Sequence, residues 1–323
     1  MTATMPFSET RSTVSSGGQD LAVFTSGRSD GPTIVLVHGW PDTHTLWNHV
    51  VGLLGERYRV VTYDSRGAGE STLPTRTREF RLDRLAADLR AVIDAVSPDA
   101  PVHVLGHDWG AVEAWELVAE ADAPTRIASY TSVSGPNLDH LALWARSKLR
   151  RPTPRGVAQV LGQVRASWYT MTFHVPPLAR LRMYRMKRKG WTAFIGEFSD
   201  VPASMVDESP TLLDDAWNGL RLYRANLFPR FAKPRRRYVS VPVHLIVNTR
   251  DAAVRPFHYA DSDRWVVDLT RTDLDAGHWS PLSHPWDIAR ITADFVDGIE
   301  ARSQASPGQA SPGQASPGQA TPT

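Results

Sequence analysis

The sequence contains no cysteine among its 323 residues. This absence excludes a disulfide framework, a zinc site built on thiolates, an iron–sulfur cluster and a cysteine nucleophile. No run of apolar residues approaches the roughly 18 that a membrane span requires. The first twenty residues, MTATMPFSETRSTVSSGGQD, have neither a basic start nor an apolar stretch, so we expect no signal peptide. We predict a cytoplasmic location.

Net charge is also small, at +2, but it is unevenly distributed. The segment 136–240 contains 19 Lys and Arg against 7 Asp and Glu, whereas the rest of the chain contains 17 against 27. A basic middle between acidic flanks indicates that the middle forms a unit of its own. The remaining composition, with 41% apolar and 22% charged residues, is ordinary for a globular protein.

Short apolar runs alternate with helical patterns in the first part of the chain. Apolar residues three and four apart mark an amphipathic helix, and continuous apolar runs mark buried strands. The expected strands are Thr33–Val37, Arg59–Tyr63, Val102–Leu105 and Ala128–Val133, and the expected helices are Phe80–Val96 and Trp109–Glu120. This alternation predicts an α/β fold with a mostly parallel central sheet covered by helices on both faces.

The alternation is interrupted from about residue 137 to residue 238, where the pattern is mostly helical. Strand patterns resume at Val243–Val247 and Trp265–Leu269, and a last helix is expected at Asp287–Arg302. We therefore predict one core, 1–135 plus 241–302, with a helical cap inserted at 136–240. The stretch 303–323 repeats QASPG and offers almost no apolar surface, so we expect a disordered tail.

The sharpest local motif is Gly106-His107-Asp108-Trp109-Gly110, where an apolar strand meets a helix. Glycines on both sides of one residue allow a strained turn that raises the central side chain above the sheet. A carboxylate in this place is a nucleophile that can attack an sp³ carbon and form an ester. The alternative is an ordinary helix cap, since aspartate is favoured there.

Two further motifs follow expected strands. His38-Gly39-Trp40-Pro41 allows the backbone N–H of Trp40 to form an oxyanion hole with the N–H of Trp109. Asp251 and His278 also lie after strands, at the edge where parallel sheets place their sites. Such a pair orients an imidazole and lets it activate water. Taken singly, Asp251 could be a turn residue and His278 a packed core histidine.

Together these motifs resemble those of the α/β-hydrolase-fold epoxide hydrolases, which also have the chain order nucleophile, acid, histidine. The resemblance covers about 20–300 and includes HGWP (38–41), DSRGAGES (64–71), GHDWG (106–110), NTRD (248–251) and GHWSPLSHP (277–285). Actinobacterial members are the most similar, and some of them carry a fused short-chain dehydrogenase domain. In this sequence the QASPG repeat stands in the place of that domain. The resemblance implies an α/β-hydrolase fold and a cofactor-free hydrolase.

The resemblance also implies site residues. In this family the cap supplies two tyrosines that hydrogen-bond the epoxide oxygen. Tyr223 matches the YRxN motif and Tyr169 matches the other position less well, with Tyr184 and Tyr238 as substitutes. A phenol O–H can stabilise and protonate the alkoxide that ring opening generates. Asp108 is then the nucleophile, Asp251 and His278 complete the triad, and Trp40, Trp109 and Trp279 line the substrate pocket.

Two other functions compete with epoxide hydrolysis. A haloalkane dehalogenase shares the aspartyl ester chemistry, but that family commonly has Asn where Trp40 stands and does not need paired tyrosines. A catalytically silent binding protein of the same fold is the other alternative, and the complete Asp108–Asp251–His278 set argues against it.

Partner predictions follow from charge and spacing. The histidines are not spaced as metal ligands are, so we predict no metal site. We also predict no cofactor. The basic runs Arg182–Lys189 and 235–237 are read as solvated surface, with contact to an anionic membrane as the alternative. We expect a small, lipophilic epoxide as the substrate, no nucleic acid partner, and a monomer or homodimer.

Overall fold

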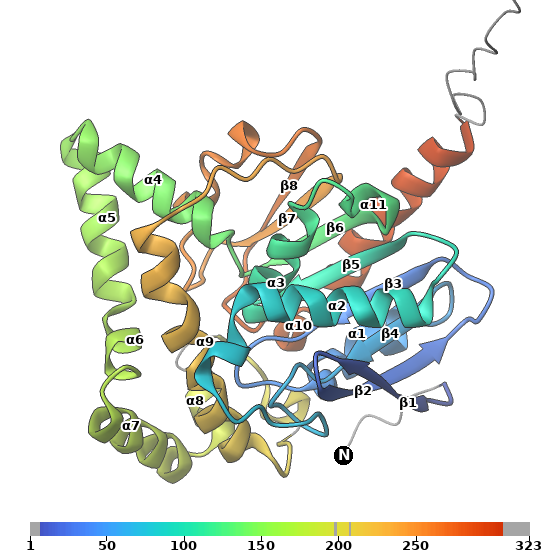
Figure 1. Cartoon of the computed structure of the whole chain (residues 1–323), viewed down its shortest axis with the longest axis horizontal. Coiled ribbons are helices and arrows are strands. Elements are labelled where there is room, and N and C mark those ends of the chain that lie inside the picture. Colours follow the sequence, from blue (N-terminus) through green and yellow to red (C-terminus); the bar gives the residue numbers. More distant parts are fainter. Residues whose placement is uncertain (1–6, 197–198, 207, 306–323) are drawn as a thin grey trace, which may run out of the picture.

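An eight-stranded sheet forms the centre of the molecule (Figure 1). The computed structural model describes residues 7–196, 199–206 and 208–305. The strands are β1 (Thr10–Ser16), β2 (Gln19–Gly27), β3 (Thr33–Val37), β4 (Arg59–Tyr63), β5 (Val102–His107), β6 (Ile127–Val133), β7 (Val243–Asn248) and β8 (Leu269–Leu274). Their spatial order is β1-β2-β4-β3-β5-β6-β7-β8. The β2 strand pairs antiparallel with both neighbours, and β3 to β8 run parallel.

Helices cover both faces of this sheet, because its inner strands are apolar on both sides. On β3, Ile34 and Leu36 pack into one buried cluster, while Val35 and Val37 pack into another. The first cluster includes residues of α1 (Asn48–Leu54), α10 (Ser280–Ser283) and α11 (Pro285–Ala305), and the second includes residues of α2 (Leu82–Val96) and α3 (Trp109–Val118). The predicted α/β sheet with helices on both faces is confirmed.

A run of helices between β6 and β7 lies at one side of the sheet (Figure 1). These helices are α4 (Leu138–Arg150), α5 (Pro154–Ala166), α6 (Trp168–Thr172), α7 (Pro176–Lys189), α8 (Trp191–Ile195) and α9 (Leu212–Ala232). Short 3₁₀ helices occupy other connections: η1 (His44–Trp47), η2 (Thr77–Phe80), η3 (Ala123–Thr125), η4 (Ala203–Met205), η5 (Pro256–Tyr259) and η6 (Ser262–Arg264). The helical character expected here is present, and the domain boundaries at 135 and 241 stay a prediction.

Side-chain hydrogen bonds attach the long helix α9 to the core. The Trp40 Nε1–H donates to the Ala216 carbonyl oxygen over 2.9 Å. Asn226 accepts from the Leu82 N–H over 2.9 Å and donates to the Phe80 carbonyl oxygen over 2.8 Å. Because these groups are buried and mutually satisfied, they fix α9 against the loop after β3 and against the start of α2.

Several sequence expectations need correction. The strand expected at Trp265–Leu269 is wrong: the structure places β8 at Leu269–Leu274, and only Val266 forms an isolated bridge. The run is apolar because Val266 is buried in the core and Trp265 stacks on a histidine, whereas β8 is an edge strand with charged, exposed positions. The β1–β2 hairpin was not predicted, because β1 is polar and mostly exposed.

The end of the chain also differs from the expectation. The α11 helix continues to Ala305, so residues 303–305 of the predicted tail are helical. The rest of the predicted tail, 306–323, lies outside the described residues. Within the described part of the chain, no helix is both long and apolar enough to cross a membrane.

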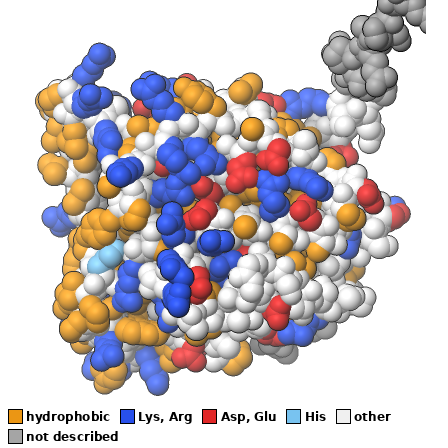
Figure 2. Space-filling view, in the orientation of Figure 1, with side chains coloured by type: hydrophobic (Ala, Val, Ile, Leu, Met, Phe, Trp, Pro, Cys, Tyr) orange, Lys and Arg blue, Asp and Glu red, His pale blue; other side chains and the backbone are white. Residues whose placement is uncertain are grey.

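Hydrophobic side chains gather along the outer edge that α5, α6 and α7 form, with Lys and Arg between them (Figure 2). Leu161, Val164 and Trp168 have about 60% of their surface exposed. The interpretation as solvated surface covered only the basic runs 182–189 and 235–237, and the exposed apolar side chains of α5 and α6 were not expected.

Candidate active site

Asp108 sits in a strained turn between β5 and α3. Its backbone has φ 50° and ψ −122°, in the left-handed half of conformational space. A Cβ on Gly110 would lie 2.3 Å from the Val37 carbonyl oxygen, and one on Gly106 would lie 2.7 Å from the Ala111 Cα. The two glycines of the motif are thus needed for close backbone approach, and the turn has the geometry that the sequence predicts.

The Asp108 carboxylate is held from two sides. Its Oδ2 accepts a hydrogen bond from the Trp40 N–H over 3.0 Å. Its Oδ1 lies 3.6 Å from His278 Nε2. The peptide between Trp40 and Pro41 is cis, and a Cβ on Gly39 would lie 2.5 Å from the Asp108 Cβ. The HGWP motif therefore shapes the wall against which the carboxylate rests.

His278 is oriented by Asp251 on the side away from Asp108. The Nδ1 atom of His278 lies 2.8 Å from Oδ2 of Asp251. The other oxygen, Oδ1, accepts from the N–H groups of Ala253 and Val254 over 2.7 and 2.8 Å. Both side chains are buried. The structure thus brings the three predicted triad residues together in the order Asp251, His278, Asp108.

The two carboxylates strongly favour the charged imidazole. Burial alone would lower the pKa of His278, but Asp251 and Asp108 outweigh it and raise that pKa to about 10. Burial would likewise raise the pKa of Asp251, and the charge and hydrogen bond of His278 keep it below its ordinary value. At neutral pH the resting site therefore holds an imidazolium between two carboxylates.

Tyr169 on α6 and Tyr223 on α9 line the same narrow cavity as Asp108 and His278, a space of about 30 Å³. Burial raises the pKa of both phenols above the ordinary value, and the Asp108 charge adds to the effect. Both are therefore protonated donors at neutral pH. The substitutes considered for Tyr169 lie elsewhere: Tyr184 is 60% exposed and absent from this lining, and Tyr238 is 64% exposed.

Aromatic neighbours fix the position of Tyr223. The rings of Trp109 and Phe173 lie edge-on to it with centroids 4.9 Å away, and the ring of Trp40 lies at 5.6 Å. Such edge-to-face contacts hold a ring in one orientation. One helical turn further along the YRxN motif, Asn226 makes the buried bonds to the core already described, so the motif combines a site residue with its anchor.

A second, larger cavity also borders Asp108. Its volume is about 410 Å³, and it shares Asp108, Tyr169 and Tyr223 with the narrow one. Most of its other lining is apolar and comes from α4, α5, α6 and α9, including Leu138, Leu141, Val164, Met171, Leu227 and Phe228. Asp108 therefore lies where a narrow space and a wide apolar space meet.

The three tryptophans expected at the substrate pocket all border these cavities. Trp40 and Trp279 line the narrow one and Trp109 lines the wide one. The N–H of Trp40 points to Asp108 in the bond given above, and Trp109 is the residue after Asp108. Within the described residues no three His, Asp or Glu side chains are grouped to hold a metal ion. The expectation of no metal and no cofactor stays a prediction.

Two residues near the site were not singled out from the sequence. Arg182 on α7 lines the narrow cavity, with its guanidinium carbon 4.9 Å from the centre of the Tyr169 ring. Asp42 accepts a hydrogen bond from Trp279 Nε1 over 3.0 Å, and burial raises the pKa of Asp42 to about 7. Asp42 directly follows the HGWP motif, which was the available signal, whereas Arg182 was counted only within a basic run.

Comparison with known proteins places the chain in a family. Residues 32–285 match the model of the alpha/beta hydrolase fold family. The chain is 44% identical over 285 residues to the "probable oxidoreductase EphD" of Mycobacterium tuberculosis, covering 87% of this chain and 48% of that protein. It is 25% identical over 327 residues to "epoxide hydrolase A" of the same organism, covering 90% and 98%.

Solved structures agree in fold. Epoxide hydrolase A of Mycobacterium thermoresistibile superimposes with a TM-score of 0.69 at 21% identity, covering 90% of this chain and 99% of that one. An epoxide hydrolase from hot-environment metagenomes gives a TM-score of 0.71 at 23% identity, covering 89% and 98%. This chain belongs to the alpha/beta hydrolase fold family, and epoxide hydrolases are among its relatives. It spans about half the length of the EphD relatives it matches.

Proposed function

We propose that this protein is an epoxide hydrolase that opens an oxirane to a vicinal diol through an ester on Asp108. The observation that carries the proposal is a single cavity in which Asp108 and His278 face two protonated phenols, Tyr169 and Tyr223. A nucleophile alone would fit several reactions. A pair of acidic O–H groups beside it fits a substrate whose leaving oxygen remains attached and must be protonated.

In the first step the Asp108 carboxylate attacks one oxirane carbon. The carbon–oxygen bond breaks, and Tyr169 and Tyr223 hydrogen-bond the oxygen as it gains charge. One phenol gives up its proton to this oxygen. The products are a hydroxyalkyl ester on Asp108 and one tyrosinate. No base is needed, so the cationic state of His278 does not hinder this step.

Ester formation itself then prepares the second step. Esterified Asp108 no longer carries the charge that lies 3.6 Å from His278 Nε2. Because Asp108 is one of the two carboxylates that raise the pKa of His278, that pKa falls once the ester forms. The proton that His278 loses balances the one that the tyrosine donated. The neutral imidazole, still oriented by Asp251, is then a base.

In the second step His278 removes a proton from water, which attacks the ester carbonyl. The developing oxyanion is stabilised by the N–H groups of Trp40 and Trp109. Support for this assignment is the 3.0 Å bond that the Trp40 N–H already makes to Asp108 Oδ2. When the tetrahedral intermediate collapses, the diol oxygen leaves with the second proton of the attacking water, Asp108 regains its charge and His278 is again cationic.

The shape of the two cavities supports a lipophilic substrate with one small and one large substituent. The narrow cavity, of about 30 Å³, leaves little room beside the triad. The wide cavity, of about 410 Å³, offers an apolar wall for the larger substituent. We also propose that the protein is cytoplasmic and that residues 136–240 form a cap on the core.

A substrate panel tests the proposed function. Terminal, internal and fatty-acyl epoxides are incubated beside haloalkanes, and release of diol and of halide is measured. We expect diol from epoxides and no halide, with larger apolar epoxides preferred. Asp108→Asn is the control that retains shape and removes the nucleophile. Halide release would favour a dehalogenase, and no turnover of any substrate would favour a silent binding protein.

A further inference from the structure

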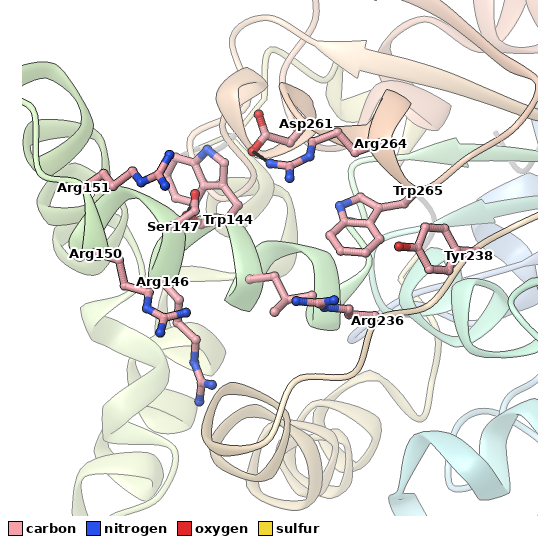
Figure 3. Close-up of a pocket in the computed structure, with 11 residues that line it drawn as sticks. Trp144, Arg146, Ser147, Arg150, Arg151, Arg236, Tyr238, Asp261, Arg264 and Trp265 are labelled. Carbon is pink, nitrogen blue, oxygen red and sulfur yellow. Dashed lines mark hydrogen bonds and ion pairs between the residues drawn. The ribbon is translucent and has the colours of Figure 1, made fainter.

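A third cavity, of about 870 Å³, lies apart from the catalytic site and is rich in arginine (Figure 3). Three segments that are distant in sequence form it: the second half of α4, residues 236–238 and residues 261–265. It shares no lining residue with either cavity at Asp108. The α4 helix separates it from the wide apolar cavity, because Leu138 and Leu141 line that cavity while Leu143 and Trp144 line this one.

Positive charge dominates the lining. Arg146, Arg150, Arg151, Arg236 and Arg264 contribute guanidinium groups, and Asp261 is the one carboxylate. Arg264 lies 3.7 Å from Asp261, and Arg146 donates to the carbonyl oxygens at the end of α9. Within the described residues, Arg150, Arg151 and Arg236 have no carboxylate partner. A cavity with this excess of unpaired guanidinium attracts anions.

The run of three arginines at 235–237 shows why Arg236 faces this cavity. Arg235 and Arg237 point to the opposite side, where both bind Glu116 over 2.7 and 3.4 Å. Successive side chains of an extended segment alternate between sides, so the residue between them faces away from that carboxylate. Arg236 thus lines the cavity instead of joining the neutralised cluster. The sequence reading of this run as a uniform solvated surface did not anticipate this division.

Helix stabilisation accounts for only part of the cluster. Arg150 lies in the last turn of α4, where a cation interacts favourably with the helix dipole. That effect does not explain why Arg236 and Arg264 approach the same space from two other segments. The convergence of three segments on one cavity is typical of a binding site.

Aromatic rings form the remaining wall. Trp265 and Tyr238 lie with ring centroids 5.4 Å apart, and Trp265 stacks on His140 at 5.0 Å. Tyr238 is 64% exposed, so its ring is accessible to a ligand. The N–H groups of a guanidinium can bind two phosphate oxygens at once. An exposed aromatic ring can contact the flat face of a nucleobase.

We propose that this cavity binds a nucleotide carrying a diphosphate. Arg150, Arg151 and Arg236 bind the phosphate oxygens, and the Tyr238 ring contacts the base. A diphosphate matches these charges better than a monophosphate, since three guanidinium groups are without a carboxylate. The proposal concerns binding alone and does not depend on the proposed hydrolysis.

Isothermal titration calorimetry on the full chain tests this, with ADP, inorganic pyrophosphate and adenosine as probes. We expect ADP to bind most tightly, pyrophosphate more weakly, and adenosine not measurably. Arg150→Ala with Arg236→Ala should weaken ADP binding by about tenfold or more, because two charge-assisted contacts are lost. Tyr238→Ala should weaken ADP but leave pyrophosphate unchanged. All three positions are exposed, so the fold is expected to survive.

Matched controls separate specific binding from general charge. Arg180→Ala with Arg188→Ala removes the same charge from exposed positions of α7 and should leave ADP affinity within about twofold. The proposal would be overturned if both pairs of substitutions lowered ADP affinity equally. It would also be overturned if the unmodified chain did not bind ADP, or if adenosine bound as tightly as ADP. Binding of the chain to phosphatidylglycerol vesicles, with no binding of ADP, would overturn it as well. Epoxide turnover should be unchanged in the Arg150/Arg236 pair.

Discussion

Neutralising Asp108 should convert His278 from a cation into a neutral base. The Asp108→Asn variant keeps the size of the side chain and removes its charge, as the ester does in the proposed reaction. The expectation follows from the position of His278 between two carboxylates, at 3.6 Å from Asp108 and 2.8 Å from Asp251. In the variant Asp251 continues to favour the imidazolium, and the charge of Asp108 no longer does.

The size of the fall in the pKa of His278 follows from the distance between Asp108 and His278. Two unit charges 3.6 Å apart interact by about 4–5 kcal/mol at an effective dielectric constant near 20. That energy corresponds to roughly three pKa units. The pKa of His278 should therefore fall from about 10 to roughly 7 in Asp108→Asn. At pH near 8 the imidazole is then charged in the unmodified protein and mostly neutral in the variant.

Nuclear magnetic resonance of imidazole-labelled protein measures this directly. Titration of the His278 signal gives its pKa, and the His278→Gln variant identifies which of the 11 histidine signals it is. Asp275→Asn is the matched control, because it removes the same charge from a side chain that is 84% exposed. The control should leave the pKa of His278 in place. An unchanged pKa in Asp108→Asn would refute the proposed coupling between ester formation and activation of the base.

Four further outcomes are expected. His278→Gln should accumulate an ester, seen by intact-mass spectrometry as one whole added substrate; full turnover would remove His278 from the mechanism. Phenylalanine at Tyr169 or Tyr223 should slow ring opening by about 10²-fold or more in rapid-mix kinetics, and normal rates would exclude the phenols. Asn226→Ala should lower the free energy of unfolding by about 1–3 kcal/mol in urea titrations, since two buried backbone groups lose partners; an unchanged value would contradict that anchor. Deleting 306–323 should leave activity and Tm unchanged, and a lowered Tm would show that this segment docks.

Much of the sheet could be predicted because its inner strands are apolar on both faces. The expected Thr33–Val37 and Arg59–Tyr63 coincide with β3 and β4. The edge strands could not be found this way, since β1 and β8 carry polar, exposed residues. Trp265 and Val266 gave a false strand because side chains that pack against the core outside a strand give the same apolar pattern as a buried strand.

The candidate triad could be located because each member follows a strand, and Asp108 and His278 also stand in short motifs that contain glycine. The placement of Tyr169 relied on family resemblance, and the structure gives it a physical basis, because its hydroxyl-bearing ring lines the cavity of Asp108. Arg182 and Arg236 could not be assigned from their runs of basic residues. Which residue of such a run faces a cavity depends on helix and strand geometry that composition alone does not contain.

The central claim is that Asp108 forms a covalent ester whose carbonyl is attacked by water. A single turnover in ¹⁸O-water, followed by peptide mass spectrometry, tests it most directly. We predict that the first-turnover label appears in the Asp108 carboxylate, because the ester carbonyl retains the oxygen of the attacking water. The diol should carry none, since both of its oxygens then come from the epoxide and the original carboxylate. Label in the diol with none in Asp108 would mean direct attack of water on the oxirane and would contradict the account.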